Sequence, residues 1–292
     1  MYIDSSRDQY TNWVYAAHRL LNSDLIDEAK KNTLKEILIN IAKKLERDLN
    51  GAYKGYLCRL DGKPGIVSDM DSDRLQAHEV LRMPMLYMAG YEASGDEYWY
   101  RKYCEKREEL LQRAEATYTV ELITDMAKGS WGYNYIYFQA QYSMRLLYDV
   151  EKDEQYRRRY LRLLQISAKG VEEYVKQAYN NKHVLKQKEE FFPPWREISA
   201  KYYGVFYEKS YYVPNILIDR PIFKWLRNLG EAVIIQAICP GYAMPQWEKE
   251  MFYTCIEEAD FENAKNYWPV LMCGAWWLAK AAGQLEETSM FV

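Results

Sequence analysis

The segment SDMDSDRLQAHE, residues 68–79, holds the densest set of side chains that could do chemistry. Three aspartates alternate with other residues, the last of them Asp73, and Arg74 and His78 follow. Hydrolysis of a glycosidic bond needs two carboxyl groups beside the scissile bond, one protonated and one ionised. The segment therefore suits such chemistry, although an Asp at this place also serves as an ordinary helix N-cap.

The same aspartate spacing does not predict a metal site. A calcium-binding EF-hand loop needs Gly at its sixth position and Glu at its twelfth, where this chain has Arg74 and Val80. The chain has 5 Cys without a CxxC pair and 3 His, which indicates core thiols and no zinc site. Phosphate-binding loops and dinucleotide-binding glycine motifs are also missing, so we expect no metal and no cofactor.

His78 and Arg82 are four residues apart, which places them on one face of a helix. A neutral His can accept a proton and Arg can pair with a carboxylate, so the two would suit a polysaccharide lyase acting on a uronate. The alternative is structural. In that case His78 lines the interior, and Arg82 forms a salt bridge with Glu79 or Glu92.

Aromatic residues make up 15% of the chain, with 28 Tyr, 9 Trp and 8 Phe. Rings that carry a polar group suit half-wet clefts better than a dry core. Trp131, Tyr133 and Tyr135 alternate at the head of an expected helix, where they could stack against sugar rings or serve as core residues.

Apolar and charged helical patterns alternate along the chain, separated by glycine, proline and acidic turns. We expect helices over residues 6–22, 24–49, 73–94, 96–127, 133–150, 153–179, 223–238, 245–258 and 267–282. Residues 181–222 break this rhythm and form a loop-rich insertion with one short helix at about 196–209. The sequence therefore predicts an all-α fold with a single domain over residues 1–292.

Three stretches run from an apolar helix into a short acidic turn and a second helix: SSRDQYTNWVYAAHRLL, HEVLRMPMLYMAGYEASGDEYW and YIYFQAQYSMRLLYDVEKDEQY. On these stretches the chain resembles the α/α-toroid (six-hairpin) carbohydrate-active proteins, which include glycoside hydrolases and polysaccharide lyases of gut-type bacteria. The resemblance implies helical hairpins that close into a complete or incomplete (α/α) toroid, a carbohydrate ligand, and a periplasmic or secreted location after removal of a signal. Five recognisable hairpin starts predict an incomplete ring or a chain trimmed at its N-terminus, whereas the unpaired thiols also suit the cytoplasm.

In such a ring the inner helices begin at one end, where the return loops gather. We expect the catalytic groups there to be Asp8, Asp73, Asp219 and His78. The expected substrate-binding residues are Arg7, Arg74, Trp131, Tyr133, Tyr135, Arg220 and Trp225. Asp73 paired with Asp8 or Asp219 predicts a glycoside hydrolase. A lyase would use His78 or a cleft tyrosine, and a binding scaffold without turnover is the third hypothesis.

The net charge argues against nucleic acid as a partner, because 39 Lys and Arg stand against 42 Asp and Glu. The hydrophobic share of 49% is ordinary for a globular protein, and no apolar run is long enough to predict a membrane-spanning helix. The sequence does not determine an oligomeric state.

Overall fold

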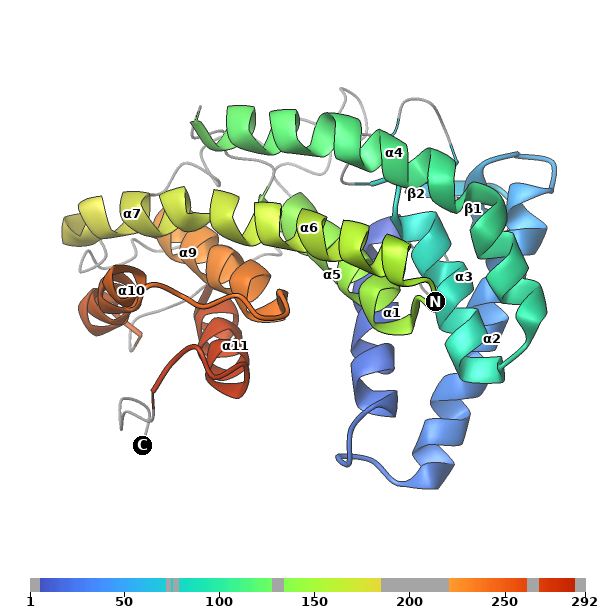
Figure 1. The fold of residues 1–292 in the computed structure, drawn as a ribbon, viewed down its shortest axis with the longest axis horizontal. Coiled ribbons are helices and arrows are strands. Elements are labelled where there is room, and N and C mark those ends of the chain that lie inside the picture. The colour runs from blue at the N-terminus through green and yellow to red at the C-terminus, as the bar shows by residue number, and fades with distance from the viewer. Residues whose placement is uncertain are drawn as a thin grey trace. The chain divides into compact units, whose positions relative to one another are not determined.

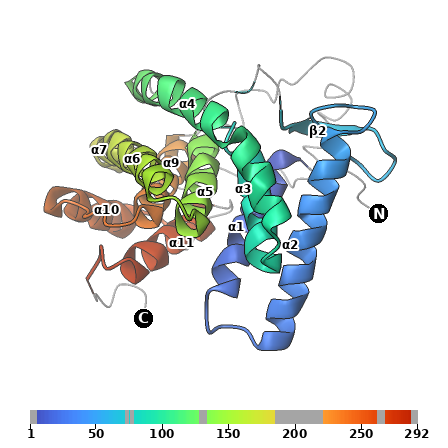
Figure 2. The same ribbon diagram turned by 45° about the vertical axis from the view of Figure 1, so that its right-hand side comes forward.

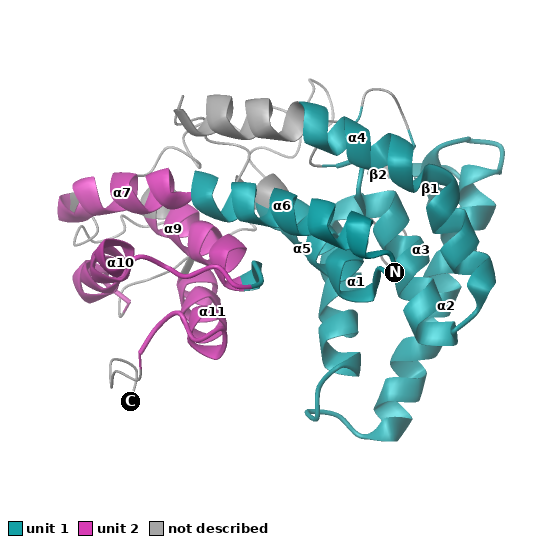
Figure 3. Cartoon of the chain, viewed as in Figure 1, with its two compact units in different colours: residues 1–170, 238–240 teal, residues 171–237, 241–292 magenta. Residues whose placement is uncertain are grey.

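The computed structural model describes residues 6–71, 75, 79–127, 134–184, 221–261 and 268–286, with the backbone alone at 66–67, 117–127, 134–137, 184, 221–225 and 268. The described part is mostly helical, which confirms the predicted all-α class. It falls into two compact units (Figure 3). Unit 1 comprises residues 1–170 and 238–240, and unit 2 comprises residues 171–237 and 241–292. A single domain and a closed toroid remain predictions.

Unit 1 is built from helical hairpins around one central helix. Its helices are α1 (Arg7–Leu21), α2 (Glu28–Leu49), α3 (Arg82–Ser94), α4 (Glu97–Ala127), α5 (Asn134–Val150) and α6 (Glu154–Gly170). Helix α3 is the central one and contacts α1, α2, α4 and α5 (Figures 1 and 2). Its first nine residues are all buried, because apolar side chains occupy nearly every face.

The three inner helices, α1, α3 and α5, run in the same direction. Near their starts, Arg82 of α3 contacts Asp8 of α1. Near their ends, His18 of α1 contacts Glu92 of α3 and Asp149 of α5. Contacts at both ends fix the register of these helices, so the segments that enter them reach the same end of unit 1.

Local sequence signals set the boundaries of the first hairpins. Helix α1 begins at a capping box in which Ser6 accepts from the Gln9 N–H and the Gln9 side chain accepts from the Ser6 N–H. Helix α3 ends at Gly95, whose φ of 68° is the left-handed conformation that glycine adopts without strain. The turn to α4 follows at once.

The expected start of the helix at residue 73 is wrong where the structure describes it. Leu75 and residues 79–81 are not helical, and α3 begins at Arg82. Pro84 lies in the first turn of α3, where its missing N–H costs nothing. Burial accounts for the apolar positions around the expected start, since Leu75, Val80 and Leu81 are all buried although none of them is helical.

A two-stranded antiparallel sheet, β1 (Tyr56–Cys58) and β2 (Pro64–Asp69), occupies part of the long segment expected to be non-helical. Asp48, near the end of α2, is 4% exposed and accepts a 2.9 Å hydrogen bond from the Cys58 N–H. Lys44 of α2 contacts this carboxylate and also donates to the Cys58 carbonyl at 2.5 Å. The sheet is therefore attached to α2 by a buried ion pair.

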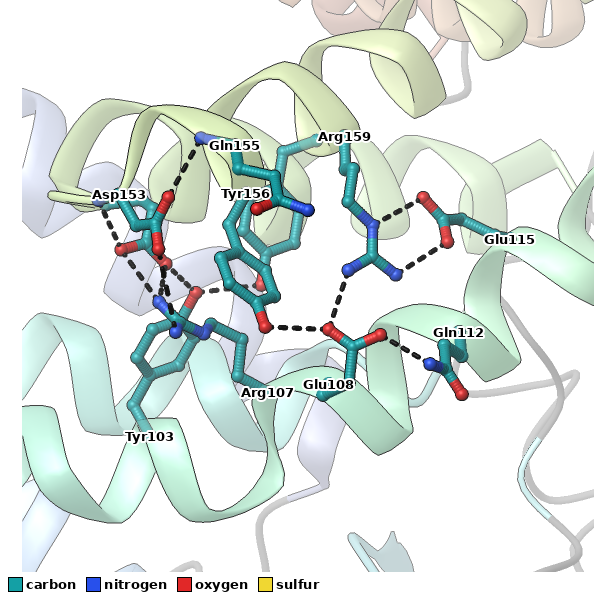
Figure 4. A network of polar contacts seen from close by, with 11 residues as sticks. Tyr103, Arg107, Glu108, Gln112, Glu115, Asp153, Gln155, Tyr156 and Arg159 are labelled. Carbon is teal, nitrogen blue, oxygen red and sulfur yellow. Dashed lines mark hydrogen bonds and ion pairs between the residues drawn. The ribbon is translucent and has the colours of Figure 1, made fainter.

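Outer helices α4 and α6 are joined by a polar network (Figure 4). Arg159 of α6 forms two hydrogen bonds with Glu115 of α4, at 2.9 and 2.7 Å, and a third with Glu108 at 2.8 Å. The Tyr156 hydroxyl also donates to Glu108, at 2.7 Å. These bonds hold the pKa of Glu108 down at about 2, so the carboxylate stays ionised.

Unit 2 contains α7 (Glu172–Asn180), the 3-10 helix η1 (Lys182–Val184), α9 (Pro221–Ile238), α10 (Gln246–Glu258) and α11 (Trp268–Ala281). One helix was expected over residues 153–179, but the structure has two helices there, with α6 ending at Gly170 and α7 beginning at Glu172. Most of the expected insertion at 181–222, including the helix at 196–209, lies outside the described residues. In the described part, no helix is long and apolar enough to cross a membrane.

Candidate functional site

The candidate site lies at the end of unit 1 where α1 and α3 begin. We call it the α1–α3 site and define it by the residues Arg7, Asp8, Asp69, Glu79, Arg82 and Gln139. It contains two of the residues expected from the sequence, Arg7 and Asp8. Two arginines, two carboxyl groups and the backbone carbonyl of Asp69 meet there from segments far apart in the chain.

Arg82 is the buried centre of the site. Its side chain is 1% exposed, contacts the Asp8 carboxylate, and donates to the Gln139 side-chain oxygen of α5 at 2.7 Å. Burial lowers the pKa of Arg82, and the charge of Asp8 opposes that shift. The Arg82 guanidinium nevertheless remains charged. Its contacts with Asp8 and Gln139 offset the cost of burying that charge.

Arg7 ties the end of strand β2 to the start of α1. It donates to the Asp69 carbonyl at 3.1 Å and forms an ion pair with Glu79, just before α3. Both side chains of this ion pair are mostly buried, at 11% and 13% exposure. The entry segments of α1 and α3 are thus joined by two neighbouring ion pairs.

The chemistry that the α1–α3 site can supply follows from these pairings. A carboxylate that pairs with a guanidinium is held in a fixed position, as a general base or a nucleophile requires. The Asp8 side chain is 26% exposed, so a ligand can reach it, whereas Arg82 is enclosed. Asp8 is the accessible anionic group of the site, and Arg82 fixes its position.

The other predicted site residues are placed as follows. Asp73, Arg74, His78, Trp131, Tyr133, Asp219 and Arg220 lie outside the described residues. Tyr135 lies on α5 and Trp225 on α9, both with the backbone alone described. The pairing of Asp8 with Asp73 or Asp219 therefore stays a prediction. Of the two structural partners expected for Arg82, Glu79 pairs with Arg7 and Glu92 with His18.

Sequence reasoning missed a partly exposed ionic cluster around the buried His18, at the opposite end of the inner helices. His18, 2% exposed, lies 2.6 Å from a Glu92 oxygen and 3.3 Å from an Asp149 oxygen. Arg145 also pairs with Asp149, at 2.9 Å, and Asn22 donates to Glu92 at 2.8 Å. We call these five residues the His18 cluster.

The charge state of His18 follows from its two acceptors. Burial alone would lower the pKa of His18, but hydrogen bonds to Asp149 and Glu92 outweigh that effect and raise it. Only the imidazolium can donate from both nitrogens. The sequence signal is weak: the last turn of α1 holds two basic residues, His18 and Arg19, and acidic residues lie near the ends of α3 and α5.

No family model, no curated protein and no solved structure matches this chain. The resemblance to α/α-toroid proteins therefore rests on the helical-hairpin pattern alone. Among the described residues, no group of three or more His, Cys, Asp or Glu side chains is arranged to hold a metal ion.

Proposed function

We propose that the chain is a glycoside hydrolase and that Asp8 is the ionised carboxylate of its active site. The contact between Asp8 and Arg82 carries the proposal. It combines a partly exposed carboxylate with a buried guanidinium that holds it in position, as a nucleophile or general base requires.

Asp73 is our first choice for the protonated partner. The segment 72–74 begins after Asp71, whose N–H donates to the Gly55 carbonyl at 3.3 Å. It ends before Leu75, whose carbonyl accepts from Arg113 at 2.5 Å. Two residues before Asp71, the β2 strand is bonded to Arg7 of α1. The residues on either side, Asp71 and Leu75, both make contacts within unit 1, and we take Asp73 as the partner of Asp8, with Asp219 as the alternative acid.

The lyase hypothesis receives less support from the described contacts. A lyase needs a guanidinium that can pair with the uronate carboxylate of its substrate. Arg7 and Arg82 already pair with Glu79 and Asp8. A lyase would therefore depend on His78, Tyr133, Arg74 and Arg220.

A binding scaffold without turnover is favoured by one specific observation. An open pocket of about 320 Å³ lies between the end of α1 and the start of α2, with almost no polar lining. It is formed by Leu20, Ile26, Lys30, Thr33 and Leu34. Such a surface could hold an apolar partner, but it offers no group for acid or base catalysis.

The deciding experiment follows product formation from a neutral glucan, a xylan and polygalacturonate. New reducing ends without ultraviolet absorbance indicate hydrolysis. Reducing ends that absorb in the ultraviolet indicate the unsaturated product of a lyase, and binding without either indicates a scaffold. For hydrolysis we expect Asp8→Asn to lower kcat by about 10² to 10⁴. Asp24→Asn, an exposed carboxylate between α1 and α2, is the matched control.

A further inference from the structure

Unit 2 contains a Tyr hydroxyl held between two carboxyl groups. Tyr242, in the turn between α9 and α10, lies 3.2 Å from an oxygen of Glu172 at the start of α7. The same hydroxyl lies 3.1 Å from an oxygen of Glu248 in the first turn of α10. We call this group the Tyr242 cluster.

The two hydrogen bonds of the Tyr242 hydroxyl cannot both form when both carboxyl groups are ionised, because only one proton is available. A Tyr hydroxyl carries one proton and can donate to one acceptor only. If Tyr242 donates to Glu172, then Glu248 must itself carry a proton and donate to the Tyr242 oxygen. Otherwise two carboxylates would compete for a single donor.

The surroundings assign the extra proton to Glu248. This side chain is fully buried, whereas Glu172 is half-buried, and both lie in the first turn of a helix, so burial is what distinguishes them. The Gln236 amide of α9 donates to the other Glu248 oxygen at 2.5 Å. Burial raises the pKa of Glu248 to about 7, despite the opposing effect of hydrogen bonds from Gln236 and Tyr242.

Among the described residues of unit 2, the charged groups that act on Glu248 come from α7. Helix α7 contributes Glu172, which disfavours the ionised form, and Lys176, which favours it. Lys176 lies 5.0 Å from the centre of the Trp247 ring. From the segment after α11, the neutral amide of Gln284 donates to the Gln236 and Tyr242 carbonyls, at 3.0 and 3.1 Å.

We propose that the Tyr242 cluster is a proton-operated switch, which holds one proton between Glu172, Tyr242 and Glu248 and weakens the packing of α10 on α7 when that proton leaves. Helices α7 and α10 are in direct contact, and the cluster joins their first turns. Loss of the proton leaves Glu172 and Glu248 as two neighbouring anions with one shared donor. The switch belongs to unit 2 and does not depend on the proposed hydrolase activity.

The direction of the pH effect follows from proton linkage. The folded state holds the Glu248 proton up to about pH 7, whereas an exposed Glu releases it near pH 4.5. The folded state therefore binds more protons in this window, and its stability falls as the pH rises through it. From about pH 6 to about pH 8, the opening equilibrium of α10 should increase by roughly tenfold.

Hydrogen exchange of the backbone amides of residues 243–258, corrected for intrinsic rates, measures this opening in the full chain. We expect wild type to lose about tenfold in protection over this interval and Glu248→Gln to lose none. Glu250→Gln, on the exposed side of α10, is the matched control and should behave as wild type. Equal pH dependence in wild type and E248Q would overturn the proposal.

A second measurement serves if E248Q does not fold. Carbon-13 NMR of the wild-type Glu carboxyl groups should show one glutamate that titrates near neutral pH. In Tyr242→Phe, which removes the shared hydroxyl, this midpoint should move. A wild-type spectrum in which every glutamate titrates below about pH 5 would overturn the proposal without any variant.

Discussion

Arg82 and Asp8 are 74 residues apart in the chain and form an ion pair at the start of two inner helices of unit 1, α3 and α1. The contact joins α3 to α1, and the Gln139 contact extends it to α5. One buried guanidinium thus connects all three inner helices at the end where the sequence predicts a site. The same contact fixes the carboxylate that we propose as the catalytic base or nucleophile.

The first prediction concerns the stability that this ion pair provides. Arg82→Met removes the guanidinium and leaves Asp8 and Gln139 without their buried partner, which should cost about 2 to 4 kcal/mol of unfolding free energy. The expected loss is smaller than for a fully buried ion pair, because Asp8 is partly exposed and solvent screens its charge. Urea unfolding measures it. In D8N/R82M the loss should fall short of the sum of the single losses by about 1 kcal/mol, whereas strict additivity would show that the two side chains do not interact.

The second prediction concerns the His18 cluster and pH. Because the pKa of His18 is raised in the folded state, its stabilising contribution is complete below the unfolded value of 6.5. It is lost as the pH rises through the folded value. Unfolding free energies across this range should fall with pH in wild type and fall less in His18→Gln. Glu248 also makes the unfolding free energy fall as the pH rises. The comparison should therefore be made between E248Q and the double variant H18Q/E248Q.

His183→Gln is the control for the histidine experiment, because His183 is exposed in η1. It should retain the wild-type pH dependence. If H18Q and H183Q had the same pH profile, the raised pKa of His18 would be refuted.

The third prediction concerns the attachment of the β-sheet to α2. Asp48→Ala removes the acceptor of the Cys58 N–H and the partner of Lys44, with an expected loss of about 2 to 4 kcal/mol. Limited proteolysis should then cut residues 51–63 faster than in wild type. Lys54→Ala, an exposed residue of the same segment, is the control and should change neither quantity much. Unchanged cleavage in D48A would contradict the attachment.

Local features of unit 1 could be predicted from the sequence. The capping box at Ser6 and Gln9 places the start of α1 correctly. The alternation of apolar and charged helices also predicts the all-α class, because helical periodicity reports directly which face is buried. These features depend on residues a few positions apart.

Features that depend on distant partners could not be predicted. His18 contacts Asp149 across 131 positions, and no local pattern indicates that contact. The start of α3 was misplaced because Leu75, Val80 and Leu81 are buried without being helical, and apolar spacing does not separate the two cases. Spacing along a single helix could not assign Arg82 to Asp8 either, because the two residues lie on different helices.

The most direct test of the central claim compares initial rates of reducing-end release by wild type, Asp8→Asn and Asp24→Asn. The substrates are the neutral glucan and the xylan, assayed with folded protein verified by circular dichroism. We expect wild type and D24N to release reducing ends and D8N to lose about 10² to 10⁴ in kcat. Release by D8N at the wild-type rate would contradict the role of Asp8, and no release by wild type from either substrate would contradict hydrolysis of these glycans.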